Sequence, residues 1–418
     1  MRNHSVVIAL LACAAPVLVA PLGAPLAAQE ALLPSTGGGV GMALSGWHFS
    51  TPLPQSSGKL VDIAEFAIPF RVRTVFGRWS LDLSGAGAVG AVHFTPSAGQ
   101  QKQNDQTEGD DRFGERLVTI YGPTDLKLRM TGPVIGDNTL VTVGLNLPTG
   151  KVGLNADETS ALQAIGAPAV GMPVGAFGTG AGATFGLIRA FQGDEWAVAV
   201  GGSIEQRTEY SPIALLLSSG TAKTNVTPGT AAHVTLGFDR PLGENRLSAL
   251  LVGDVFSKDL VRLDDGSGTE SRSDFTLGPQ VTATTRIDLA ASRWRESALN
   301  VAVRMRSAFS DASGSKVSGS AGTYLEASIG GVRGGADGTG LVVAADARWH
   351  SGLEFTDALV GAAVTAVGMT VGWDTQRARS ATRFVLHAQF GTFDTGSATT
   401  TGFGGSLGFS IGARREAR

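Results

Sequence analysis

The sequence is short of cysteine, of charge and of long hydrophobic runs. Its single cysteine is Cys13, so no disulfide can form within the chain and no cysteine cluster can bind a metal. Charged residues make up 17% of the 418 residues, and the formal net charge of -3 argues against a nucleic-acid-binding protein. Beyond the N-terminal region, no stretch reaches the roughly 20 apolar residues that a membrane-spanning helix requires. A chain of this kind crosses a membrane only as a closed β-sheet, because an open sheet edge finds no hydrogen-bond partner in lipid.

The first residues have the order of a secretory signal. Arg2 precedes an apolar stretch, and small residues up to Ala28 offer a cleavage site. We therefore expect residues 1–28 to be a signal peptide and residues 29–418 to form the exported domain. The residues around Cys13 faintly resemble a bacterial lipoprotein box. Lipidation of Cys13 and its removal with the signal peptide are two alternatives.

Glycine, in contrast, is abundant, and much of its total of 58 residues lies in segments that alternate between two kinds of side chain. In the last such segment, Phe403, Leu407 and Ile411 share one face, and Gly404 and Gly408 share the other. A period of two indicates a β-strand, because a helix would scatter these residues around its circumference. One apolar face and one small or polar face are what a strand of an outer-membrane barrel requires.

The same alternation predicts about sixteen strands along the chain, with fourteen as the alternative. The predicted strands cover residues 39–50, 60–76, 78–94, 117–130, 138–147, 179–190, 195–209, 230–239, 245–257, 272–287, 297–309, 320–333, 340–350, 362–373, 381–390 and 401–413. We interpret them as an all-β fold, a transmembrane antiparallel up-and-down β-barrel. A soluble β-sandwich would also alternate, but it would seldom need so many strands of about ten or more residues.

The lengths of the connections support the barrel. Connections after even-numbered strands are short, as at 77–78 and 192–194, and those after odd-numbered strands are long, as at 96–116, 148–178 and 210–228. Short periplasmic turns that alternate with long outer loops are typical of bacterial barrels. This phase places both chain termini in the periplasm, as an even number of strands requires.

Three short motifs resemble a known family. They are Gly122-Pro123-Thr124-Asp125-Leu126-Lys127-Leu128, Leu147-Pro148-Thr149-Gly150 and Phe177-Gly178-Thr179-Gly180. With these motifs the chain resembles the outer-membrane transporter family linked to phenol-degradation (meta-pathway) proteins, which is distantly related to the long-chain fatty-acid transporters. The resemblance covers mainly residues 60–210 and implies passive uptake of hydrophobic or aromatic compounds.

Two features depart from this pattern. The Asn-Pro-Ala sequence that marks the N-terminal plug of the fatty-acid transporters is absent, so a built-in plug of that type is not expected. The chain ends in the arginine-rich residues 414–418, whereas many outer-membrane proteins end on an aromatic residue that the insertion machinery recognises. Phe409, inside the last predicted strand, is the candidate for that role.

The candidate site consists of charged and histidine side chains on the face of the predicted strands that does not meet lipid. We expect the following residues to line the lumen: Glu65, Arg71, Arg73, Asp82, Lys127, Arg129, Arg304, Arg306, Asp346, Arg348, His350, Asp374, Arg383 and His387. Any wide barrel must fill its interior with paired charges and water, and this alone accounts for such residues. A basic cluster among them would also tune which solutes pass, as charged linings do in channels. Both interpretations remain open.

Two loop segments offer other features. Asp105, Glu108, Asp110 and Asp111 are acidic enough to suggest calcium, but their spacing fits no EF-hand, and a solvated outer loop is the favoured explanation. Residues 156–165 have a helical composition. They either fold inward and narrow the pore or lie on the outer rim.

The sequence favours a channel over an enzyme. The histidines have no metal-binding spacing, and Ser351 next to His350 would point to the opposite face of its strand. We expect no catalytic residue, no metal and no cofactor. The leading hypothesis is a passive channel for small, hydrophobic or aromatic solutes, with the outer-membrane lipid bilayer and the insertion machinery as partners and no nucleic acid. The alternatives are a non-conducting structural or surface-interaction barrel and, third, an outer-membrane hydrolase; the oligomeric state stays open.

Overall fold

The computed structural model describes most of the chain. The described residues are 38–55, 58–96, 115–136, 138–167, 170–217, 220–264, 270–291, 293–334, 338–352, 363–377, 380–394 and 399–413. The expected signal peptide with Cys13, the acidic residues of the loop at 105–111 and the C-terminal residues 414–418 lie outside these ranges.

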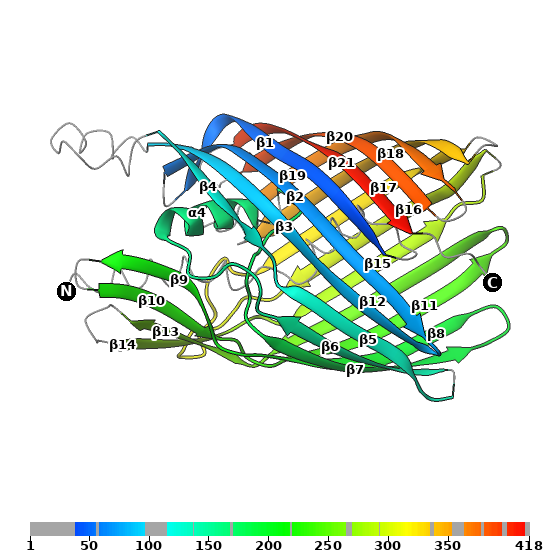
Figure 1. Cartoon of the computed structure of the whole chain (residues 1–418), viewed down its shortest axis with the longest axis horizontal. Coiled ribbons are helices and arrows are strands. Elements are labelled where there is room, and N and C mark those ends of the chain that lie inside the picture. Colours follow the sequence, from blue (N-terminus) through cyan, green and yellow to red (C-terminus); the bar gives the residue numbers. More distant parts are fainter. Residues whose placement is uncertain are drawn as a thin grey trace.

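Sixteen antiparallel strands close into a barrel (Figure 1). Their segments are β1 (Gly39–Gln55), β2 (Gly58–Phe76), β3 (Trp79–Thr95), β4 (Arg116–Pro123), β5 (Leu126–Ile135), β6 (Thr139–Leu147), β7 (Gly182–Gln192), β8 (Ala197–Arg207), β11 (Ala231–Leu242), β12 (Asn245–Phe256), β15 (Gln280–Asp288), β16 (Trp294–Arg306), β17 (Gly322–Gly334), β18 (Thr339–Gly352), β19 (Ala363–Gln376), β20 (Ser380–Asp394) and β21 (Thr399–Ala413). Segments β4 and β5 count as one barrel strand, because they pair with successive parts of β3. The barrel closes at β1, where Gly39 lies opposite Arg71 of β2 and Gly412 of β21. The predicted fold class is confirmed, with sixteen strands rather than fourteen.

Side-chain burial follows the period of two read from the sequence. On β2, Phe66, Ile68 and Val72 are exposed, whereas Glu65 and Ala67, which alternate with them, are buried. Large apolar side chains exposed in rows on the outside of a sheet are unfavourable in water but suit contact with lipid. The alternation therefore gives the barrel an apolar exterior. Its interior face is small, polar or charged except toward the outer end, where large apolar side chains such as Trp47 and Phe94 are buried inside.

One predicted barrel strand is wrong in its extent. The segment 272–287 does not form a single strand: its first residues belong to β14 (Glu270–Thr276) of a separate sheet, and the barrel strand β15 begins at Gln280. Pro279 lies between the two and has no N–H to donate to a strand ladder. The alternation of side chains continues across this break, so periodicity alone does not reveal it.

A second predicted strand, 117–130, is interrupted and longer than expected. It divides after Pro123 into β4 and β5, with Thr124 and Asp125 between them, and β5 continues to Ile135. Part of the segment expected to be a periplasmic turn is therefore strand. The interruption is where the wall of the barrel meets the long connection between β6 and β7.

Short and long connections lie at opposite ends of the barrel, as predicted. The strand ends joined by the short turns β2–β3, β5–β6, β7–β8 and β11–β12 gather at one end. The strand ends joined by the long connections β3–β4, β6–β7, β8–β11 and β12–β15 gather at the other, on the left in Figure 1. The facing ends of β1 and β2 and of β20 and β21 also lie at this end, but few residues separate them in the sequence because these strands are longer. We call the two ends periplasmic and outer, following the usual orientation of such barrels.

The outer end carries a second sheet, most of which was expected to be loops. Its four strands are β9 (Tyr210–Leu217), β10 (Gly220–Thr227), β13 (Lys258–Asp264) and β14 (Glu270–Thr276), in the order β9-β10-β13-β14. Tyr210, Val226, Val261 and Phe275 form its small apolar core. Burial in this core raises the pKa of Tyr210 to about 12.

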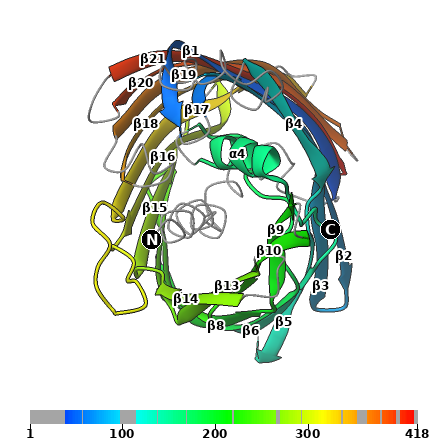
Figure 2. The ribbon, with the colours of Figure 1, turned by 90° about the vertical axis from the view of Figure 1, so that its left-hand side faces the viewer.

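A ten-residue helix lies inside the outer half of the barrel (Figure 2). This is α4 (Ala156–Ile165), and it coincides with the segment of helical composition. Asn155 caps its N-terminus by accepting a hydrogen bond from the Glu158 backbone N–H, and the Glu158 side chain accepts one from the Asn155 backbone N–H. The helix contacts β2, β3, β4 and β9, so the segment folds inward rather than lying on the rim. No described helix is long and apolar enough to span a membrane.

Candidate functional site

The connection between β6 and β7, residues 148–181, is anchored to the barrel wall at Asp125; we call it the inward segment. The Asp125 carboxylate accepts hydrogen bonds from the backbone N–H of Gly150 (2.8 Å) and of Thr179 (2.7 Å), from the Thr179 hydroxyl (3.0 Å) and from Nδ2 of Asn146 (3.0 Å). Two of these residues lie near opposite ends of the inward segment, so one buried carboxylate fastens both ends to the wall. All three motifs of the family resemblance meet here.

The motifs contain small residues because the two ends of the inward segment approach each other closely here. A Cβ on Gly150 would lie only 2.3 Å from the carbonyl oxygen of Phe177, so no larger residue fits between the two ends of the segment. The Thr149 hydroxyl accepts a hydrogen bond from the Leu126 backbone N–H (3.0 Å) and donates one to the Thr124 carbonyl (3.1 Å). These contacts cover the backbone left open where β4 and β5 separate.

From this anchor, the inward segment packs against the inner face of the wall. Ile165, at the end of α4, lies over Gly90 of β3, where a Cβ would be 2.3 Å from Ile165 Cδ1. The buried cluster around it includes side chains of the segment and of β1, β2, β3, β4, β19 and β20: Trp47, Phe49, Ile63, Val92, Phe94, Ile120, Leu162, Val170, Met172, Val174, Phe177, Val364 and Phe393. Burial of a side chain of this size contributes roughly 1.5–3 kcal/mol, so the cluster holds the segment firmly to one side of the barrel.

Two polar contacts fix the second half of the inward segment. Glu65 is 1% exposed, and its Oε1 accepts a hydrogen bond from the Val174 backbone N–H at 2.8 Å. Trp47 Nε1 donates to the Val170 carbonyl at 2.8 Å. The second carboxylate oxygen of Glu65 is buried and has no hydrogen-bond partner among the described residues. Backbone groups of the segment thus depend on side chains of β1 and β2.

Arg348 of β18 completes the contact with the segment. Its guanidinium lies 5.6 Å from the centroid of the Trp47 ring, and its Nη2 donates to Gln389 Oε1 at 2.8 Å. A Cβ on Gly171 would lie 2.3 Å from Arg348 Nη1, so the backbone of the segment passes directly over this guanidinium. Arg348 was predicted as an interior residue from the sequence, but its partners Trp47 and Gln389 were not.

Other predicted interior residues form separate polar pairs on the wall. Arg71 Nε donates to Asp82 Oδ2 at 2.6 Å, joining β2 to β3. His387 Nε2 of β20 lies 3.2 Å from Asp346 Oδ1 of β18, although β19 runs between their strands. Gly368 of β19 makes this possible, because a Cβ there would meet both side chains.

Two further groups of contacting side chains include residues that were not predicted from the sequence. Arg383 donates to Asp374 Oδ1 (3.2 Å) and to Glu296 Oε2 (2.9 Å). Arg304 lies over the ring of Tyr324, with its Cζ 5.4 Å from the centroid. Glu296 and Tyr324 are recognisable only from the register that joins distant strands. The fourteen predicted residues therefore form several groups rather than one site.

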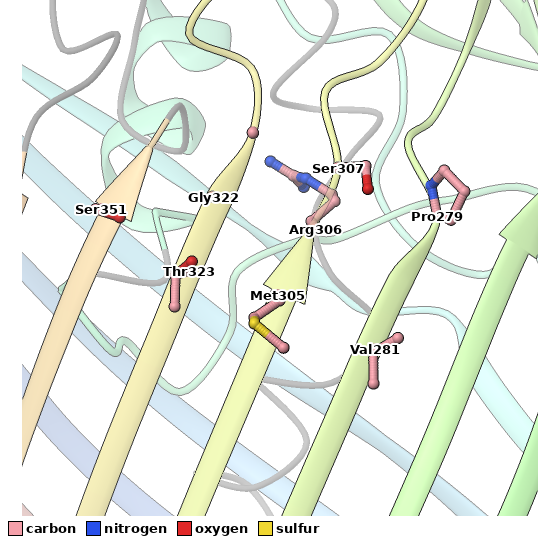
Figure 3. Close-up of a pocket in the computed structure, with 9 residues that line it drawn as sticks. Pro279, Val281, Met305, Arg306, Ser307, Gly322, Thr323 and Ser351 are labelled. Atoms are coloured by element: carbon pink, nitrogen blue, oxygen red, sulfur yellow. The ribbon is translucent and has the colours of Figure 1, made fainter.

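His350 and Ser351 lie on opposite faces of β18. Ser351 lines a pocket of about 460 Å³ at the outer end of β15–β18, together with Val281, Met305 and the end of β16 at Arg306 (Figure 3). His350 is buried, and its ring lies 6.2 Å from that of Tyr324. The pair therefore does not form a serine–histidine dyad. Among the described residues, no group of three or more His, Cys, Asp or Glu could hold a metal ion.

The fold and its polar interior define a β-barrel of the outer-membrane type. Neither a scan against protein-family models nor a search of curated proteins found a match. The chain is similar to solved structures of the CymD monoaromatic hydrocarbon channel (8% identity, 96% of this chain and 94% of that chain, TM-score 0.39) and of the Pseudomonas putida toluene transporter TodX (10%, 95% and 94%, 0.40). It is also similar to the outer membrane protein OpdK of Pseudomonas aeruginosa (10%, 89% and 98%, 0.36). At these identities and TM-scores, the matches identify no solute for this chain.

Proposed function

We propose that the chain is an outer-membrane channel for passive uptake of small hydrophobic or aromatic compounds, and that the inward segment sets the width of the path. The observation that carries this proposal is the set of solvent-exposed cations on the inner wall. Arg73, Lys127 and Arg129 alternate with outward apolar residues on β2 and β5, yet all three are exposed. A barrel with a filled interior would bury and pair such charges, since an unpaired buried charge is costly.

The choice of hydrophobic or aromatic solutes rests on the inward segment. Its anchor at Asp125 is built from the three motifs by which the sequence resembles transporters linked to phenol degradation. The segment also brings Val170, Met172 and Val174 against an apolar part of the wall. These side chains are buried between the segment and the wall, so the proposed solute class rests on the resemblance of the motifs.

The remaining expectations belong to the same proposal. Residues 1–28 direct export, the barrel inserts through the outer-membrane insertion machinery, and the fourteen interior residues named from the sequence line or flank the path. Transport in this proposal needs neither a cofactor nor energy coupling, because solutes diffuse down their gradients.

Planar-bilayer recording and uptake into liposomes test the proposal. The full exported chain, purified and shown to be folded by heat-modifiable migration on a gel, should produce discrete conductance steps. Liposomes that contain it should take up benzyl alcohol or phenol faster than protein-free liposomes. Absence of both conductance and uptake would favour the non-conducting structural barrel instead.

A further inference from the structure

Four inward cations on β2 and β5 lie side by side with Asp82 across the barrel wall. The strand register places Arg73 opposite Asp82 and Asp82 opposite Arg129, in one row across β2, β3 and β5. The next row toward the outer end contains Arg71, Ser84 and Lys127 in the same way. Residues directly opposite each other on neighbouring strands have Cβ atoms about 4.5–5.5 Å apart, so the two rows form a continuous patch. We call these six residues the cationic pad.

The carboxylates near the pad are already engaged. Asp82 is bonded to Arg71, and the buried Asp125 accepts four hydrogen bonds that anchor the inward segment. Glu205 of β8 lies in the same row of the wall as Arg129, beyond Gly144 and Thr184, and is 3.0 Å from Arg207 on its own strand.

Arg73, Lys127 and Arg129 consequently have no carboxylate within ion-pair distance among the described residues, although Glu205 and Asp125 act on Lys127 from further away. Within the described part of the chain, none of the three forms an ion pair, and all three are exposed to the interior. The pad thus holds four cations against one carboxylate, and it has donors free to bind an anion. Arginine is well suited to this, because its planar guanidinium binds a carboxylate through two parallel hydrogen bonds.

The position of the pad suggests the shape of its ligand. Toward the outer end, the same strands present Ala67, Ala86 and Ala88, which are buried beneath the inward segment. The wall therefore changes from apolar to cationic within a few residues, directly below the anchor at Asp125. The alanines themselves are covered by the segment, so the pad supplies the contact for an anionic group, and the apolar body of the solute follows from the proposed channel function.

We propose that the cationic pad binds the carboxylate of small apolar acids, such as aromatic monocarboxylates, as they pass the inward segment. This inference rests on the proposed channel function and narrows its substrate class. The pad attracts the anion by charge and binds it by hydrogen bonds, while the apolar body of the acid stays on the side of the inward segment. The surrounding wall limits screening by salt, so the attraction is stronger than at an open surface.

Benzoate and benzyl alcohol, which share a ring but differ in charge, separate this inference from the proposed function. Uptake of each is measured in liposomes that contain the full exported chain or the triple variant Arg73→Gln, Lys127→Gln and Arg129→Gln. We expect benzoate uptake by the triple variant to fall by about tenfold or more, which corresponds to the loss of roughly 1.4 kcal/mol. Benzyl alcohol uptake should change little, and the reversal potential in a KCl gradient should shift toward cations.

Arg240→Gln serves as the matched control. Arg240 is an exposed cation at the periplasmic end of β11, 3.7 Å from Glu195 and away from the pad, so its removal should leave both uptakes unchanged. Heat-modifiable migration checks that each variant is folded, and the single variant Arg129→Glu provides a second test should the triple variant misfold.

The outcomes are distinguishable. If the wild-type protein admits benzyl alcohol but not benzoate, or if the folded variants admit benzoate as well as the wild type does, the pad does not bind carboxylates and the channel proposal still stands. If neither solute enters through the wild-type protein, the channel proposal itself is wrong.

Discussion

The carboxylate of Glu65 on β2 accepts a hydrogen bond from the backbone N–H of Val174, a residue 109 positions further along the chain. Both residues are buried, so this bond joins the barrel wall to the inward segment without help from solvent. An acceptor at this point is required, because a buried N–H without a partner costs about 1–3 kcal/mol. Glu65 therefore has a structural role, because it holds the inward segment against the barrel wall.

Replacing Glu65 should loosen the attachment of the inward segment to the wall. In Glu65→Ala the Val174 N–H loses its partner, and we expect single-channel currents with more frequent fluctuations and a larger maximal conductance. Glu65→Gln retains a carbonyl oxygen that can accept the same bond, so its currents should resemble those of the wild type. Identical recordings from Glu65→Ala and the wild type would show that the apolar cluster alone holds the segment.

The anchor at Asp125 should be still more sensitive. In Asp125→Asn, one of the two oxygens becomes an NH₂ group and faces N–H donors, so one end of the inward segment is released at a cost of about 1–3 kcal/mol. Limited proteolysis of the purified protein should then cleave within 148–181 faster than in the wild type. Asp239→Asn is the control, because Asp239 binds Arg246 near the periplasmic turn and is far along the chain from the segment. Equal cleavage rates in all three proteins would contradict the role of Asp125.

The contact between Gly90 and Ile165 should behave as a coupled pair. Gly90→Val places side-chain atoms where Ile165 Cδ1 lies and should displace α4 from the wall. Ile165→Ala removes the obstruction but leaves a cavity, and substitutions of this kind cost about 2–5 kcal/mol. The double variant should therefore be less impaired than the sum of the two single variants, as measured by the rate of proteolysis of the segment. Strict additivity would mean that the two residues do not touch.

The outer sheet should be sensitive to alkaline pH. Burial raises the pKa of Tyr210 to about 12, compared with about 10 for an exposed tyrosine. The folded sheet disfavours the phenolate, so its stability is fully present below pH ~10 and falls as the pH rises from about 10 to about 12, by roughly 2–3 kcal/mol. The absorbance of tyrosinate in the wild type minus that in Tyr210→Phe should show this late titration. A midpoint near 10 in that difference would indicate that the sheet leaves Tyr210 open to water.

Most of the barrel could be predicted from local alternation. Phe403, Leu407 and Ile411 are exposed on one face of β21, and a slip of one residue would turn them all inward, so their pattern identifies both the strand and its outer face. The wrong prediction at 272–287 has a local cause. Pro279 lies in the middle of a segment that otherwise alternates, and it separates β14 from β15. The outer sheet escaped prediction because its short strands have little alternation of their own.

The site was harder to predict because its contacts join distant parts of the chain. Asp125 belonged to a recognised motif, but its role as an anchor depends on Gly150 and Thr179 returning to it. The inward position of α4 could not be read from its composition, since the same apolar residues would also suit a helix on the rim. Trp47 gave no signal, because its partner Val170 lies 123 residues away.

The edge of β9 has a consequence for any exchange of loops in this protein. Its Ser211 and Pro212 carbonyls accept hydrogen bonds from Gly153 and Leu154 of the inward segment, and the Ala214 N–H donates one to the Leu154 carbonyl. The other edge of β9 pairs with β10, so the inward segment and the β9–β10 hairpin are joined by one continuous set of backbone hydrogen bonds. A chimaera that takes the inward segment from another barrel must therefore take the β9–β10 hairpin with it. Without that hairpin, the backbone groups of the grafted segment that correspond to Gly153 and Leu154 would lose their hydrogen-bond partners on β9.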